Sequence, residues 1–325
     1  MDLILEGTLL CLSQLIQYIN MQTADRILVL VEVNKHDDTV YDFVNRIIDV
    51  IDSEKLYFLH VADNLDIPKA LVEKYPGLLP PVDESLNSAI TGKLKEYSNI
   101  ATHKSVVIDT VEGAKMEVIS RYIRDNDIDL LVVNRIGYSE DEVGYLQKLI
   151  RRSSCSVALV PPSVSENIKN LLVPLDFSTN SAMALELATA LISKHSDMHV
   201  YGLHIYKLPH GYFKTGLSKE EFIEEMISHA KVEVEGFIKR SGIDPGRFTM
   251  NYRMNTGDGI PYMVTRFAFA NKIDAIVLGS RGGNSMSSFF LGRVTEALID
   301  RDQYLPMFVV KNKGENLKLW EAISS

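Results

Sequence analysis

A glycine-rich loop in the second half of the chain is the segment best suited to bind an anion. It reads GSRGGNSMSSFFLGRVTE over residues 279–296, with glycines at 279, 282 and 292. Glycine lets the backbone approach a ligand closely and adopt conformations that other residues avoid. Gly292 stands where the next helix is expected to begin, and the free amides and dipole of a helix start favour an anion. The loop therefore predicts a cradle for phosphate groups.

The loop differs from the common nucleotide fingerprints. It matches neither G-x-x-x-x-G-K-[ST] nor G-x-G-x-x-G, so a P-loop and a dinucleotide-binding turn are disfavoured. The S-G-G-x-D-S loop of adenylating enzymes and the H-x-G-H motif of nucleotidyltransferases are missing as well. No Ser-His-Asp set and no paired carboxylates stand out. The sequence therefore indicates binding without apparatus for efficient ATP chemistry.

The elements around the loop alternate between strand and helix. Apolar runs such as KNLLVPL, MHVYGLHIY, DAIVLGS and PMFVVK are separated by amphipathic stretches such as 219–240. This order predicts parallel strands joined by right-handed helical crossovers in a doubly wound sheet. Ligands of such sheets bind beyond the carboxyl ends of the strands. The residues to consider are therefore Asp176, Ile205 and the loop 279–292.

The first half of the chain repeats this pattern. RILVLVEV, from residue 26, aligns with NLLVPLDF, from residue 170, and places Glu32 opposite Asp176 (176 − 32 = 144). His60 and His204 have the same separation (204 − 60 = 144). One register held over so much chain indicates a tandem duplication. Both histidines lie in apolar strands, so we interpret them as core residues bonded to backbone.

The glycine spacing G-x2-G-x9-G after the fourth strand, with the D-F-S turn after the first, resembles the universal stress protein family. The resemblance implies an α/β fold of two tandem doubly wound parallel-sheet domains, of the adenine nucleotide alpha hydrolase type. It also implies that the last strands, SVALVPP and MFVVK, join the two copies into an intramolecular pseudo-dimer. The expected domains cover residues 24–162 and 166–312, followed by a C-terminal tail over 313–325.

The same resemblance implies which residues bind a nucleotide. In the nucleotide-binding branch of the family, the turn after the first strand and the end of the second bracket the adenine, and the glycine loop holds the ribose and phosphates. Carried over by position, the adenine side is Pro174, Leu175, Asp176 and Ile205. The ribose and phosphate side is Leu278, Gly279, Arg281, Gly282, Gly292, Val294 and Thr295.

Arg293 departs from the family, in which a Ser or Thr follows the third glycine. Its guanidinium can pair with a phosphate more strongly than a hydroxyl does. Its bulk can equally fill the space that the phosphates need, or the side chain can point to solvent. The sequence leaves these alternatives open.

The first copy of the loop keeps only one of the three glycines. Asn134 replaces the first, Gly137 remains, and Gln147 stands where the third is required. The acidic residues 140–142 would repel phosphates at close range. We expect no ATP in the first domain, which would keep the fold for stability or pairing.

Composition narrows the classes of partner. The formal net charge is −9, whereas sequence-independent binding of DNA or RNA needs an excess of positive charge. The only cysteines, Cys11 and Cys155, offer neither metal spacing nor a disulfide framework. A zinc site at His195 and His199 is disfavoured because no cysteine is near. We therefore expect a cytoplasmic protein with no nucleic-acid partner.

Residues 1–23 precede the first repeat. Their longest apolar run is far shorter than the roughly 20 residues that a bilayer requires, and no basic stretch marks a signal peptide. Leucine and isoleucine recur at spacings of three and four, which predicts an amphipathic helix that docks on the protein or on a second chain: Leu5, Leu9, Leu12, Ile16 and Ile19.

These observations favour a stress-response regulator that binds ATP, ADP or AMP, with or without Mg²⁺, in its second domain and without dedicated catalysis. It would report to a protein partner, and it could form a homo-dimer through the N-terminal helix or the sheet edges. One alternative is a ligand-free scaffold that acts through protein contacts. Another is a slow ATPase or autophosphorylating protein with serine acceptors at Ser285, Ser287 and Ser288. The stretch 62–84, with four prolines, is expected to be a long loop.

Overall fold

The computed structural model describes residues 24–51, 53–66, 69–75, 81–135, 140–165, 168–193, 197–280, 291–301 and 304–313. The helix predicted over 1–23 lies outside these residues, as does the tail after residue 313. All statements below concern the described ranges.

The first half of the chain alternates strands and helices as predicted. Its elements are β1 (Arg26–Leu30), α2 (Asp37–Val50), β2 (Lys55–Ala62), α3 (Lys69–Lys74), α4 (Val82–Leu94), α5 (Ser98–Ala101), β3 (Val106–Glu112), α6 (Lys115–Asp125), β4 (Leu130–Asn134), α7 (Glu140–Arg152) and β5 (Ser156–Val160).

The second half repeats the order. Its elements are β6 (Asn170–Pro174), α8 (Thr179–Ser193), β7 (His199–Tyr206), the 3-10 helix η1 (Tyr212–Thr215), α9 (Lys219–Ser241), a second 3-10 helix η2 (Pro245–Arg247), β8 (Thr249–Met254), α10 (Ile260–Ala270), β9 (Ala275–Gly279), α11 (Arg293–Arg301) and β10 (Met307–Val310).

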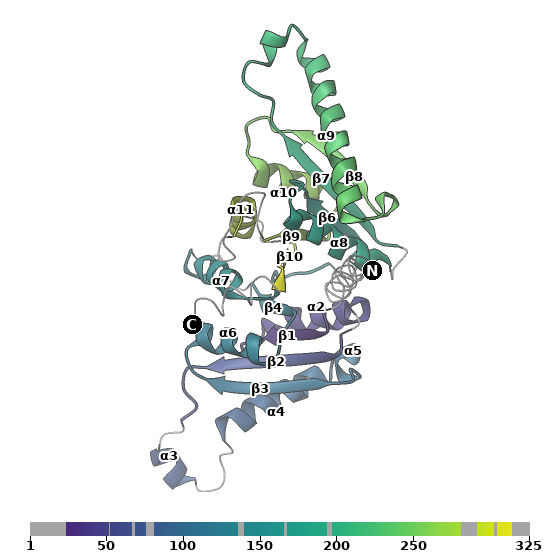
Figure 1. The fold of residues 1–325 in the computed structure, drawn as a ribbon. Coiled ribbons are helices and arrows are strands. Elements are labelled where there is room, and N and C mark those ends of the chain that lie inside the picture. Colours follow the sequence, from purple (N-terminus) through teal and green to yellow (C-terminus); the bar gives the residue numbers. More distant parts are fainter. Residues whose placement is uncertain are drawn as a thin grey trace, which may run out of the picture.

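All ten strands form one continuous sheet (Figure 1). The order is β3-β2-β1-β4-β5-β10-β9-β6-β7-β8, so each half has the order of a doubly wound sheet, and the halves meet at β5 and β10. Pairing is parallel within each half and antiparallel only at this seam, where Phe308 lies opposite Ala158. The predicted intramolecular pseudo-dimer is confirmed.

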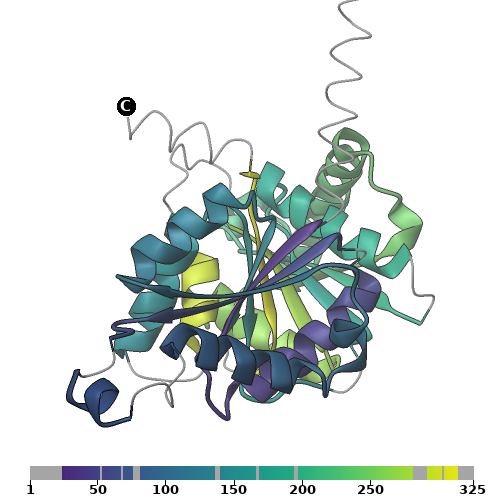
Figure 2. The same cartoon turned by 90° about the horizontal axis from the view of Figure 1, so that it is seen from below.

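Helices cover both faces of the sheet, as Figure 2 shows, and this explains the nearly uninterrupted apolar strands. In β1, Ile27 and Val29 point into a core beneath α2, α4 and α8. Leu28 and Leu30 point into a second core beneath α6, α7, α10 and α11. Both cores draw residues from both halves. The two halves therefore share their hydrophobic stabilisation.

Buried cations join the halves at the ends of two helices. Lys311, which follows β10, donates from Nζ to the carbonyl oxygens of Ile150 and, at 2.7 Å, of Ser153, where α7 ends. In the opposite direction, Arg135 follows β4 and donates to the carbonyl oxygen of Ile299 near the end of α11. Each half thus satisfies carbonyl groups that the last turn of the other half's helix leaves unpaired.

The two halves also share the positions at which the backbone adopts an unfavourable conformation. The described non-glycine residues with positive φ are Val33, Asp127, Phe177 and Lys272. They form two equivalent pairs, because Phe177 follows Val33 by 144 residues (177 − 33) and Lys272 follows Asp127 by 145 (272 − 127). Side chains with a Cβ rarely adopt this conformation. Its repetition shows that the fold itself requires it at these turns.

The region predicted as a long loop over 62–84 is partly helical. It contains the short helix α3 and the first turn of α4, for which Pro81 is the N-cap residue. Proline fits the start of a helix because the amide that it lacks would have no intrahelical partner there. Among the described residues, no helix has both the length and the apolar character needed to cross a bilayer.

Candidate functional site

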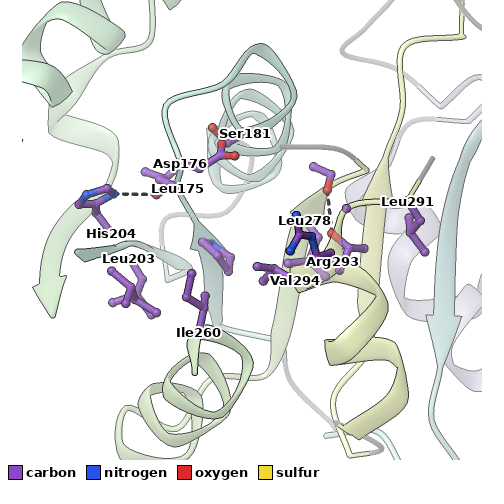
Figure 3. Close-up of a pocket in the computed structure, with 15 residues that line it drawn as sticks. Leu175, Asp176, Ser181, Leu203, His204, Ile260, Leu278, Leu291, Arg293 and Val294 are labelled. Carbon is purple, nitrogen blue, oxygen red and sulfur yellow. Dashed lines mark hydrogen bonds between the residues drawn. The ribbon is translucent and has the colours of Figure 1, made fainter. Parts of the chain in front are cut away.

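A cavity of about 490 Å³ opens at the carboxyl ends of β6, β7 and β9 (Figure 3). This volume lies within the range of about 300–1,000 Å³ typical of small-molecule sites. Its walls come from the three strand ends and from the first turns of α8, α10 and α11: Pro174, Leu175, Asp176, Ser181, Leu203, His204, Ile205, Ile260, Leu278, Gly279, Leu291, Gly292, Arg293, Val294 and Thr295.

The residues predicted for the nucleotide site converge on this one cavity. All of them line it except Arg281 and Gly282, which lie outside the described residues. Their role in binding stays a prediction. Ser181, Leu203, His204, Ile260 and Leu291 also line the cavity and were not predicted as site residues. Ile260 could have been predicted, because it is the first residue of α10, the helix that follows the carboxyl end of β8.

The adenine side of the predicted site is held by a half-buried histidine. His204 Nδ1 donates to the carbonyl oxygen of Leu175 at 2.9 Å, and its ring stacks on Phe177 with centroids 4.4 Å apart. His60 makes the same 2.9 Å contact with Val31 in the first half. The predicted bond to backbone is confirmed for both histidines, but neither is a core residue: both are half-buried, and His204 lines the cavity. In the second half the contact fixes the turn that carries Asp176.

Gly279 is required by packing. A Cβ atom there would lie 2.7 Å from the backbone carbon and oxygen of Asn180, a distance that real Cβ atoms do not reach. The absence of a side chain therefore lets the end of β9 approach the start of α8. The Thr295 hydroxyl donates to the carbonyl oxygen of Gly279 at 3.0 Å and ties α11 to the same strand end.

The amide of Gly292 is not free, contrary to our expectation. It donates to the carbonyl oxygen of Ser280 at 2.8 Å and so closes the base of the glycine loop. Helix α11 begins one residue later, at Arg293. The amides of Arg293, Val294 and Thr295 have no acceptor among the described residues, as expected for the first turn of a helix. The prediction of an anion at this helix start therefore moves from the amide of Gly292 to these three amides.

Arg293 lies at the start of α11, on the side of the cavity formed by β9 and α11, whereas Asp176 and His204 lie on the side formed by β6 and β7 (Figure 3). It is exposed, and no described carboxylate forms an ion pair with it. The Asp176 carboxylate accepts from the amide of Ser178 at 3.1 Å. The rest of the lining is mainly apolar.

The equivalent place in the first half carries charged side chains. Lys115, the counterpart of Ile260 (260 − 115 = 145), forms an ion pair with Glu32, the counterpart of Asp176. Asp37, the counterpart of Ser181 (181 − 37 = 144), accepts from the amides of Glu32 and Asn34 at 3.1 Å. Burial raises the pKa of the Asp37 carboxyl. Of the two carboxyl groups here, that of Glu32 is paired with Lys115, and the absence of ATP from this half stays a prediction.

The helix that follows the first-half loop begins earlier than its counterpart. Helices α7 and α11 end on the related sequences LIRR and LIDR, at Arg152 and Arg301, a separation of 149. Counting back, Gly292 corresponds to Val143 (292 − 149 = 143), inside α7, and not to Gln147. Gln147 was assigned as the counterpart of Gly292 by assuming a constant shift of 145 residues between the halves. That assignment was wrong because the first-half loop is four residues shorter (149 − 145). The third glycine is absent under either alignment.

No group of three His, Cys, Asp or Glu side chains within the described ranges is arranged to hold a metal ion. His199 instead packs edge-on against Tyr201, with ring centroids 4.5 Å apart, while His195 lies outside these ranges.

A model of the universal stress protein family matches the chain twice, over residues 23–161 and 167–310. The chain belongs to the universal stress protein family. The two matches confirm the tandem arrangement predicted from the repeat. None of the curated proteins compared with this universal stress protein matches it.

Solved structures share the tandem fold. A functionally unknown protein from Pseudomonas aeruginosa PAO1 is 14% identical with a TM-score of 0.66, over 94% of this universal stress protein and 99% of that chain. A putative universal stress protein from Pseudomonas aeruginosa UCBPP-PA14 gives the same identity and score, over 94% and 100%. A universal stress protein from Archaeoglobus fulgidus DSM 4304 is 17% identical with a TM-score of 0.59, over 89% and 98%. At these identities the likeness concerns the fold.

Proposed function

We propose that this universal stress protein binds an adenine nucleotide, ATP, ADP or AMP, in the cavity of its second domain and acts as a non-catalytic regulator. The observation that carries the proposal is the convergence of the predicted residues from three strand ends and one helix start on a single cavity. Ligands of doubly wound sheets bind at this edge. The proposed domains are those expected from the repeat, 24–162 and 166–312.

The lining suits the parts of a nucleotide. Leu203, Ile205 and Ile260 offer an apolar surface for the flat base, and the Leu175 turn beside them is held by His204. The free amides in the first turn of α11 lie where we place the phosphates, and such amides favour an anion. The described lining contains no nucleophile paired with a base.

Nucleotide content and calorimetry test the proposal. The purified protein is denatured and the supernatant analysed for nucleotides, and ATP, ADP and AMP are then titrated into ligand-free protein. We expect heat of binding that is lost in Ile205→Trp, because the indole fills the cavity. The matched change Val61→Trp, at the equivalent first-half position (205 − 61 = 144), should leave binding intact. Absence of both bound nucleotide and heat would leave the scaffold alternative.

A further inference from the structure

The cavity of the second domain is poor in the ligands that a magnesium ion uses. Mg²⁺ bound to nucleotides in proteins is usually held by one or two carboxylates together with phosphate oxygens and water. Asp176 is the only carboxylate that lines the described cavity, and it already accepts from the amide of Ser178. The sequence from 277 to 295 contains no Asp or Glu, so the glycine loop supplies no carboxylate.

The same cavity has a positive charge built into the protein. Arg293 lies on its phosphate side, at the first position of α11, with no ion-pair partner among the described carboxylates. A guanidinium pairs with phosphate through two parallel hydrogen bonds, and it stays charged at every physiological pH. Its charge therefore lies on the side of the cavity that is proposed for the phosphates.

Resting on the proposed nucleotide site, we propose that Arg293 takes the place of the metal and that the cavity binds nucleotide phosphates free of Mg²⁺. The guanidinium and a chelated Mg²⁺ compete for the same phosphate oxygens, since both neutralise the same charge. Removal of the metal should therefore leave the affinity unchanged or increase it. The affinity should also fall with rising salt, because an exposed ion pair is screened.

Calorimetric titration of ADP and ATP in excess MgCl2 and in EDTA tests this inference. For the unaltered protein we expect binding in EDTA at least as tight as in MgCl2. Arg293→Ser should weaken binding in EDTA by about tenfold or more, which corresponds to about 1.4 kcal/mol or more for one charge-assisted contact. Arg293→Lys should recover part of the loss, because it restores the charge without the planar pair of donors.

Arg301→Ser is the matched control, because it removes the same charge from the exposed far end of the same helix. It should leave both titrations unchanged, and circular dichroism melts should show that all three variants fold. Binding that requires MgCl2, or Arg293→Ser binding as tightly as the unaltered protein, would overturn the inference while sparing the nucleotide site. Absence of nucleotide binding by the unaltered protein in both buffers would refute the site itself.

Discussion

Gly279 shows at the scale of one residue how packing and binding depend on the same position. The sequence suggested it as part of a phosphate loop, and the structure adds that a side chain there would meet the backbone of Asn180. Asn134 holds the equivalent first-half place and donates from Nδ2 to the carbonyl oxygen of His36 at 2.7 Å. His36 corresponds to Asn180 (180 − 36 = 144). The first half therefore has a side-chain hydrogen bond where, in the second half, the backbone of Gly279 packs closely on that of Asn180.

Gly279→Ala should therefore destabilise the protein by about 1–3 kcal/mol, the usual cost of overpacking. The midpoint of urea unfolding measures this loss, and nucleotide titration should show weaker binding because the cavity wall moves. Gly144→Ala in α7 is the control: nothing lies within 4 Å of the added methyl group, so this helical position should gain about 0.5–1 kcal/mol. Equal effects of the two changes would argue against a packing role for Gly279.

Glu186 predicts a pH dependence of stability. It lines a hollow between the halves with apolar neighbours including Met183 and Phe308, and burial raises the pKa of its carboxyl from about 4.5 to about 7. Between these values the unfolded chain has lost a proton that the folded protein keeps. The contribution of Glu186 to stability therefore falls as the pH rises through this window and is constant outside it.

Glu186→Gln should accordingly raise the free energy of unfolding at about pH 8 and leave it nearly unchanged at about pH 4. The gain should be on the order of 1 kcal/mol, because the side chain remains partly exposed and water screens its charge. Urea unfolding at both pH values measures it. Glu224→Gln, on the exposed face of α9, serves as control. A gain of the same size at both pH values would contradict the assignment.

At the scale of elements, the cations that cross the seam bind each half to the other. Lys311→Met should cost about 1–3 kcal/mol, because it removes a buried donor from carbonyl groups at the end of α7. Chemical unfolding measures the loss, and hydrogen exchange should show it first in the last turn of α7. Lys169→Met, which removes an exposed ion pair with Asp197 at 3.5 Å, should cost less than about 1 kcal/mol. Protection of α7 equal to that of the unaltered protein would contradict this role for Lys311.

Much of the element order could be predicted from the sequence. Continuous apolar runs identify strands buried on both faces, and the repeat supplies each assignment twice. The start of α7 could not be predicted, because a constant shift between the two halves does not reveal that the loop before α7 is four residues shorter than its counterpart. The Lys115–Glu32 ion pair was equally hidden, since it joins residues 83 positions apart whose proximity depends on the finished sheet.

At the scale of the whole molecule, one sheet and two shared cores predict a single unfolding unit. Urea unfolding followed by circular dichroism should give one transition, with hydrogen exchange of β1 and β6 lost together, because each core contains residues of both halves. Two separate transitions, one for each half, would contradict this. The seam is the place to weaken the coupling: Phe308→Ala removes a ring that packs on Phe43 with centroids 5.9 Å apart.

The antiparallel seam also determines how one chain could meet another. Since β5 and β10 pair with each other, the strands left at the ends of the sheet are β3 and β8 (Figure 1). These edges are different surfaces, so joining β3 of one copy to β8 of the next leaves a free edge each time and grows an open filament. Joining β3 to β3, or β8 to β8, generates a two-fold axis at that contact. The duplication pairs β5 with β10 inside one chain. A second chain that adds a strand to this sheet must therefore do so at β3 or at β8, and these two edges differ.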